Sequence, residues 1–248
     1  MSGHNRWSKI KRQKAAMGAT KGKLYSKVIK EITVAARLGG GDPAGNARLR
    51  AAITAGREAN MPNDSIQRAV KKGTGELEGE SYEEVTYEGY GPGGVAVLVE
   101  CLTDNRNRTS GELRATFGRG GGNMGAEGAV AWMFNKKGTI TVKPGLTEDQ
   151  VMEKAIEAGA EDVINLGEEG FEVRTAPVDL HTVAASLESA GLKLGEQKWV
   201  YLPQTTVKLE GDNARKMLKL MDALDENDDV QNVHANFEID EALMESLH

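Results

Sequence analysis

The spacing of apolar residues changes once along this chain, at the polar run of residues 73–81. Before this run, apolar residues such as Leu24, Val28 and Ile32 recur at the period of an amphipathic helix. After it, short apolar runs typical of strands alternate with helical patterns. The change predicts a helical N-terminal domain, a linker, and a body that mixes strands with helices.

Three helices are predicted in the first part of the chain. The first spans Lys21 to Leu38 and ends at three glycines, because glycine readily adopts the left-handed conformation of a C-terminal cap. The second runs through Leu49 to Ala59, and the third starts near Pro62, a residue that suits the first helical turn. Three short amphipathic helices can share one core, which predicts a basic helical domain over residues 1–75.

The next domain is predicted to be discontinuous in sequence. Strands are expected at residues 84–87, 95–102 and 129–135. A helix between the last two is predicted to be capped by Thr109, which forms a capping pair with Glu112. After Pro203 the pattern predicts a strand, a helix and a strand, at residues 206–209, 212–224 and 229–239. These elements supply the partner helix that the first series lacks, so the domain comprises residues 82–136 and 204–240.

The segment between these two parts forms a complete series of its own. Its elements follow the order β-α-β-β-α-β, and its first helix carries a capping pair, Thr147 with Gln150. This order is the split arrangement of a ferredoxin-like domain. The predicted fold class is therefore α+β: an N-terminal three-helix domain followed by two ferredoxin-like α+β domains, with the third, residues 137–203, inserted into the second.

Charge divides along the chain in the same way. Residues 1–75 hold 16 Lys and Arg against 4 Asp and Glu, whereas residues 76–248 hold 15 against 33. The net charge of −6 therefore combines +12 in the first part with −18 in the second. Such asymmetry predicts a polyanionic partner for the basic part, usually nucleic acid. The acidic body disfavours indiscriminate binding to polyanions.

The cations of the first thirty residues are the main candidate binding residues. No acidic residue precedes Glu31, so nothing nearby balances them. Phosphate contacts by such groups release condensed counterions, which makes binding steeply salt-dependent, and a tryptophan among them can stack on an unpaired base. The alternative is a merely solvated charged surface. The predicted nucleic-acid-binding residues are Arg6, Trp7, Lys9, Lys11, Arg12, Lys14, Lys21, Lys23, Lys27 and Lys30.

Arg106 and Arg108 form a second candidate site for phosphate. With Thr109 as the cap, both stand at the positive end of a helix dipole, where a cation is disfavoured by up to about 1 kcal/mol. A phosphate bound at that helix end would reverse the sign of this effect. The sequence leaves an alternative open, in which either arginine pairs with a carboxylate of the acidic region.

The residue pattern gives little support for an enzyme. The chain has four histidines, and no HExxH, no GxSxG and no phosphate-binding loop followed by lysine. The acidic cluster between Asp222 and Asp229 lacks the alternation and central glycine of a calcium loop, so it is interpreted as a solvated turn. We expect no catalytic residues, no metal and no cofactor.

The single cysteine, Cys101, excludes an internal disulfide framework and is expected to pack in a strand as a small hydrophobe. This usage indicates a reducing compartment, the cytoplasm or an organelle derived from it. No apolar run approaches the roughly 20 residues that span a bilayer, so no membrane partner is expected.

Several long motifs give the chain a family resemblance. They are Gly3-His4 with Trp7 and the basic run behind it, LGGGDP (38–43), YEGYGPGG (87–94), DNRNRT (104–109) and GGNMG (121–125). In this order, and over essentially the whole chain, they resemble the YebC/PmpR family. The resemblance implies three domains and a role in gene expression. Members are usually described as transcriptional regulators that bind promoter DNA. Mitochondrial relatives are translational activators for a cytochrome oxidase subunit, and bacterial relatives have been linked to ribosomes stalled on proline-rich chains.

Three functional hypotheses follow. The first is a regulator that binds DNA through the basic N-terminal domain, although no recognition helix with base-reading side chains stands out. The second is a ribosome-associated translation factor that binds ribosomal RNA or tRNA, which suits an extended basic arm and a second arginine site. The third, a small-molecule enzyme or sensor, has no catalytic constellation behind it. The common prediction is a nucleic-acid-binding regulator of gene expression.

Overall fold

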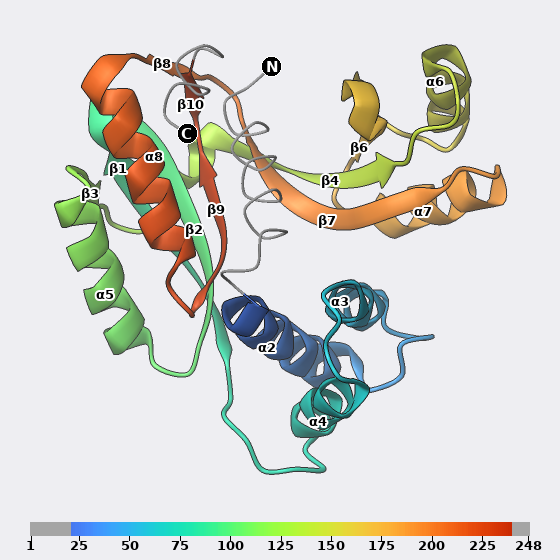
Figure 1. Ribbon diagram of the computed structural model, residues 1–248, viewed down its shortest axis with the longest axis horizontal. Coiled ribbons are helices and arrows are strands. Elements are labelled where there is room, and N and C mark those ends of the chain that lie inside the picture. The colour runs from blue at the N-terminus through green and yellow to red at the C-terminus, as the bar shows by residue number, and fades with distance from the viewer. Residues whose placement is uncertain (1–20, 240–248) are drawn as a thin grey trace. The chain divides into compact units, whose positions relative to one another are not determined.

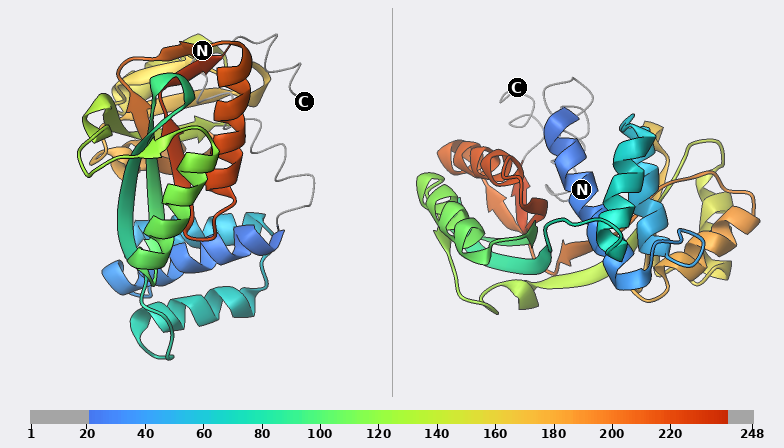
Figure 2. Two further views of the ribbon diagram at one scale, coloured as in Figure 1. Left: turned by 90° about the vertical axis from the view of Figure 1, so that its left-hand side faces the viewer. Right: turned by 90° about the horizontal axis from the view of Figure 1, so that it is seen from below.

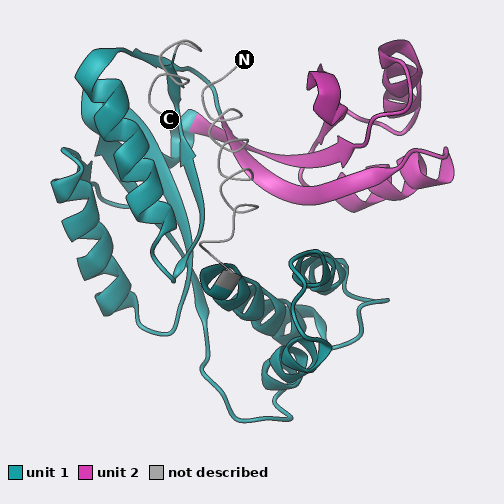
Figure 3. Ribbon diagram, viewed as in Figure 1, with its two compact units in different colours: residues 1–133, 203–248 teal, residues 134–202 magenta. Residues whose placement is uncertain are grey.

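The computed structural model describes residues 21–239 and is shown in Figure 1. The chain divides into two compact units, one formed by residues 1–133 and 203–248 and the other by residues 134–202 (Figure 3). The chain therefore leaves the first unit once and returns to it, so the second unit is an insertion. The fold class is α+β, with helices first and sheet domains after them, as predicted.

The three predicted N-terminal helices are present as α2 (Lys21–Gly39), α3 (Ala47–Glu58) and α4 (Asn63–Thr74). Asn46 caps α3 by accepting a hydrogen bond from the backbone N–H of Leu49, and its amide donates to Ala35 at the end of α2. A side chain at Gly73 would overlap the carbonyl oxygen of Thr33, so glycine permits the close approach of α4 to α2. The helices share one apolar core, which includes Ile32, Leu49, Ile53 and Ile66.

The sheet of the first unit has the strand order β3-β1-β2-β9. Its strands are β1 (Glu83–Gly91), β2 (Val95–Thr103), β3 (Asn123–Met124) and β9 (Val230–Ala235). Helices α5 (Arg106–Arg119) and α8 (Gly211–Asp225) cover one face of it (Figures 1 and 2). Because α5 joins β2 to β3 with β1 between them, this is a split β-α-β arrangement. The core on this face includes Val97, Val99, Leu113, Phe117, Met217 and Leu220.

The predicted strand over residues 129–135 is wrong. Residues Ala131–Met133 form a short 3-10 turn, and β4 (Phe134–Val142) begins only after it. The reason is the buried Glu88, whose carboxylate accepts hydrogen bonds from three backbone N–H groups of residues 128–131. Burial alone would raise the pKa of Glu88, but these hydrogen bonds outweigh it and lower that pKa.

The predicted strand over residues 229–239 is two strands. The chain bends at the buried Asn236, whose side chain accepts a hydrogen bond from the N–H of Ala96. The strand β10 (Phe237–Ile239) then pairs in parallel with β8 (Val207–Leu209), so β8 lies in a separate two-stranded sheet. Elsewhere, Cys101 is buried in β2 as expected, and burial, assisted by Asp229, raises the pKa of its thiol to about 12.

The second unit is ferredoxin-like. Its elements are β4, α6 (Glu148–Glu157), β5 (Asp162–Asn165), β6 (Phe171–Thr175), α7 (Leu180–Ser189) and β7 (Leu194–Pro203). The strand order β5-β6-β4-β7 places both β-α-β crossovers across an intervening strand. The predicted capping box of Thr147 and Gln150 is confirmed at the start of α6. No helix within residues 21–239 has the length and apolarity of a membrane span.

Candidate nucleic-acid interface

The structure describes part of the predicted binding set. Arg6, Trp7, Lys9, Lys11, Arg12 and Lys14 lie outside the described residues. Lys21 begins α2. The remaining predicted cations fall into two groups, with Lys23, Lys27 and Lys30 on α2 and with Arg106 and Arg108 in the first turn of α5. All five belong to the same compact unit.

The lysines of α2 lie on one side of the helix and contact a segment that we call the acidic loop, residues 225–229. The Nζ of Lys23 donates to the carbonyl oxygen of Glu226 at 3.1 Å. The Nζ of Lys27 lies 3.0 Å from a carboxylate oxygen of Asp225 and 2.7 Å from its carbonyl oxygen. The Nζ of Lys30 lies 2.6 Å from Oδ1 of Asp229 and donates to the carbonyl oxygen of Asp228 at 2.9 Å. The cationic side of α2 thus binds the chain's own acidic loop.

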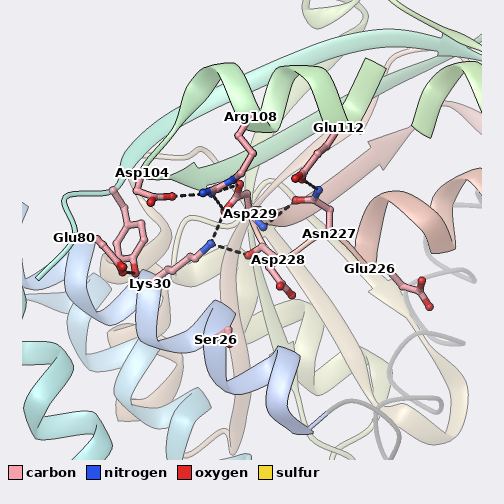
Figure 4. A pocket seen from close by; sticks show the side chains of 11 residues that line it. Ser26, Lys30, Glu80, Asp104, Arg108, Glu112, Glu226, Asn227, Asp228 and Asp229 are labelled. Atoms are coloured by element: carbon pink, nitrogen blue, oxygen red, sulfur yellow. Dashed lines mark hydrogen bonds and ion pairs between the residues drawn. The ribbon is translucent and has the colours of Figure 1, made fainter. Parts of the chain in front are cut away.

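Asp229 is the centre of this contact (Figure 4). Its side chain is only 3% exposed, and besides Lys30 it accepts hydrogen bonds from Arg108 at 2.9 Å and from the hydroxyl of Thr109 at 2.7 Å. Burial would raise the pKa of Asp229, but the hydrogen bonds from Arg108, Lys30 and Thr109 lower it to about 2. Two cations from different domains therefore share one ionised carboxylate.

The predicted cap of α5 is wrong. The helix begins at Arg106 after the cap Asn105, whose side chain accepts a hydrogen bond from the backbone N–H of Arg108. Thr109 lies inside the helix and is buried, because its hydroxyl donates to Asp229 instead of capping. The capping pair with Glu112 therefore does not form at this helix end.

The sequence left open whether Arg108 binds phosphate or pairs with a carboxylate of the acidic region, and in the structure it pairs with carboxylates. Its guanidinium lies 2.7 Å from Asp104 and 2.9 Å from Asp229, and these hydrogen bonds raise the pKa of Arg108 further. The same contact lowers the pKa of Asp104. The two carboxylates offset the unfavourable helix dipole. Arg106 differs, since its side chain is 65% exposed and lies 4.0 Å from the equally exposed Glu83.

A pocket of about 520 Å³ lies beside this contact (Figure 4). It is lined by Ser26, Lys30, Glu80, Tyr82, Asp104, Arg108, Glu112, Glu226, Asn227, Asp228 and Asp229. Six of these residues are acidic and two are basic, so the pocket is not a phosphate site in this state. Burial and the nearby Glu80 raise the pKa of the Tyr82 hydroxyl. The acidic cluster is thus more than a solvated turn, although no cluster with metal-ligating geometry occurs within residues 21–239.

Comparisons with known proteins place the chain in a family. Residues 5–76 match the TACO1/YebC protein N-terminal domain, and residues 82–237 match the TACO1/YebC second and third domain. The chain belongs to the YebC family. A relative from Myxococcus xanthus is 74% identical over 100% of this chain and 99% of its own length, and one from Geobacter sulfurreducens is 58% identical over the whole of both. Both are named probable transcriptional regulatory proteins.

A solved YebC-family relative shares the fold. The crystal structure of a conserved hypothetical protein, Aq1575, from Aquifex aeolicus matches with a TM-score of 0.83 at 51% identity. The match covers 90% of this chain and 93% of that one.

Several further exposed cations were not predicted as binding residues. They lie on α3, α4 and α5 of the first unit, and they are Arg50, Arg57, Arg68, Lys71, Lys72 and Arg114. In the sequence these cations alternate with other residues of the same helices, so only the fold shows which of their side chains face solvent.

Proposed function

We propose that this YebC-family chain is a nucleic-acid-binding regulator of gene expression, which binds DNA through its basic N-terminal domain. The observation that carries the proposal is the division of charge, +12 over residues 1–75 against −18 over residues 76–248. The names of the relatives from Myxococcus and Geobacter support a regulatory role. The exposed cations of α3 and α4, including Arg57, Arg68 and Lys71, supply phosphate contacts from the described part of that domain.

A second candidate is an RNA-binding translation factor that acts on the ribosome. The exposed Arg106 and Arg114 favour it, because they place cations on a second domain in addition to those of the basic helices. Contacts spread over two domains suit the irregular surface of a folded RNA better than one groove of a duplex.

The first experiment measures affinity for a DNA duplex and a structured RNA of equal length over a range of salt concentrations. For the full chain, log K should fall linearly with log salt, by about 0.9 per phosphate contact on duplex DNA. Replacement of Lys9, Lys11, Arg12 and Lys14 by alanine should make that slope shallower. A control replaces Lys208 and Lys216, which are exposed and pair with neighbouring carboxylates of the acidic body, and the change in slope is compared per cation removed. An unchanged slope in the arm variant would exclude the arm as a source of affinity.

The second experiment separates DNA from RNA in cells. A lysate is fractionated on a density gradient with and without RNase, and the chain is detected in each fraction. Recovery of specific promoter fragments, without migration with ribosomes, supports the DNA-binding regulator. Migration with ribosomes that RNase abolishes supports the translation factor instead.

A further inference from the structure

We propose that the acidic loop is an internal competitor of nucleic acid: it covers the cationic side of α2 in this structure and leaves it when nucleic acid binds there. The proposal rests on the proposed function, because it concerns how cations of the N-terminal domain become available to phosphate.

The acidic loop uses the contacts that a phosphate would use. Carboxylate oxygens of Asp225 and Asp229 lie 3.0 and 2.6 Å from the Nζ atoms of Lys27 and Lys30, which is the geometry of a charge-assisted hydrogen bond to an anion. These lysine side chains are only 14% and 12% exposed. A phosphate therefore reaches them only after the carboxylates have moved.

Asp229 lies between two domains and binds a cation from each. Lys30 belongs to the helical domain and Arg108 to the sheet domain, and both were selected from the sequence as phosphate-binding residues. In the structure one carboxylate binds both. Asp229 thus stands where a phosphate would bridge these two cations, and the two anions exclude each other.

The contact between these two domains is of a kind that can open. Each domain has its own apolar cluster, one around Ile32 and Leu49 and the other around β2, α5 and α8. The described links between them include hydrogen bonds, ion pairs such as Arg48 with Glu84 at 2.7 Å, and a cation–π contact of Lys30 with the ring of Tyr82. Such contacts weaken with salt and are individually weak when partly exposed. The connecting residues 75–80 are exposed throughout, so the chain itself does not hold the domains together.

The alternative is a permanent clamp, in which the loop fixes the helical domain and plays no part in binding. The two ideas differ in one consequence. A competitor weakens binding at the lysines that it covers, so removal of a loop carboxylate strengthens binding beyond the general effect of one less negative charge. If the loop is only a clamp, removal of one of its carboxylates strengthens binding only by the general effect of one less negative charge.

The test uses Asp225→Asn in the full chain and a labelled 30-nucleotide duplex as probe, with binding followed by fluorescence anisotropy. Asp225 is suited to it because its side chain is 22% exposed and lies outside the buried hydrogen bonds of Asp229, so the variant should fold. The control is Asp212→Asn, which removes the same charge from the same helix, where Asp212 pairs with Lys216 one turn away. We expect Asp225→Asn to bind the duplex about two- to fivefold more tightly than the control does. This factor corresponds to the contribution of one partly exposed ion pair.

The same comparison in a chain that carries Lys27→Gln isolates the contact between Lys27 and Asp225. Lys27→Gln removes the ion pair between Lys27 and Asp225, so in this background the gain of Asp225→Asn over Asp212→Asn should be smaller. Persistence of the full gain in that background would overturn the proposal, as would equal affinity of Asp225→Asn and Asp212→Asn in the normal one.

Amide hydrogen exchange gives an independent result on the loop itself. The backbone N–H of Asp229 donates to the side chain of Asn227 within the loop. Saturating duplex should speed exchange of this amide if the loop is displaced, and slower or equal exchange would refute displacement. If neither the wild-type chain nor any variant binds duplex or RNA, the proposed function fails together with this inference. Binding without a difference between the aspartate variants overturns the inference alone.

Discussion

Replacement of Asp229 by asparagine tests the central contact of the first unit. The substitution keeps the shape of the side chain but removes the charge that Lys30 and Arg108 share. It leaves two partly buried cations facing a neutral amide, so the attachment of the helical domain to the sheet domain should weaken.

The size of the effect follows from the pKa of Asp229. The folded state lowers it from 3.8 to about 2, nearly two pKa units, and each unit corresponds to about 1.4 kcal/mol. After a discount for solvent screening, the charged form therefore contributes about 2 kcal/mol at pH 7. For a chain of this size this predicts a fall in Tm of roughly 4–8 °C. Because the folded pKa is the lower one, the contribution is present above about pH 5 and is lost as pH falls toward 2.

The assay is calorimetry of the wild-type chain and the variant at several pH values, since calorimetry can resolve separate transitions of different domains. The difference in unfolding free energy between the wild-type chain and the variant should have its full size at pH 7. It should fall to roughly half at pH 3, where the wild-type chain has already lost part of the contribution of the charge. Asp212→Asn is the control, because that side chain lies on the surface and pairs only one turn away. A difference that does not shrink toward acid pH would show that the charge of Asp229 is not its source.

Two other predictions concern elements that shape the first unit. Glu88→Gln keeps the size of the side chain but weakens three charge-assisted hydrogen bonds to backbone N–H groups, so it should cost about 2 kcal/mol in urea denaturation and speed proteolysis near residue 128. An unaltered cleavage rate would contradict this role for the carboxylate. Gly73→Ala should destabilise the helical domain, because the new Cβ would overlap the Thr33 carbonyl, whereas Gly118→Ala on α5 meets open space and should be neutral or stabilising by up to about 1 kcal/mol. Equal thermal stability of the two glycine variants would refute the close-approach argument.

Local patterns were sufficient to predict most of the elements but not the contacts between domains. The helical period around Val28 and Ile32, and the capping box at Thr147, depend on neighbours within one or two turns, and the structure confirms both. Asp229 is different, since Lys30 is separated from it by 199 residues. In the sequence an acidic run that binds a distant helix looks the same as one that faces water.

The error at the start of α5 has the same origin. Asn105 and Thr109 are both residues that favour a helix cap, and the local sequence allows either. The choice is made by a tertiary contact, because Thr109 is needed inside the helix as a donor to Asp229. The strand predicted over residues 129–135 failed likewise, since the carboxylate that converts it into a turn comes from β1.

The internal ion pairs divide the predicted binding residues into two energetic classes. A lysine that moves from Asp225 or Asp229 to a phosphate exchanges one anionic partner for another, so the move adds little net electrostatic energy. Exposed cations such as Arg57 and Lys71, for which no carboxylate partner is described within residues 21–239, lose no such contact on binding. While the acidic loop still covers the lysines of α2, the affinity for nucleic acid should therefore come from these exposed cations. The lysines of α2 should then contribute to selectivity, because only a ligand that contacts several phosphates at once can compensate for opening the acidic loop.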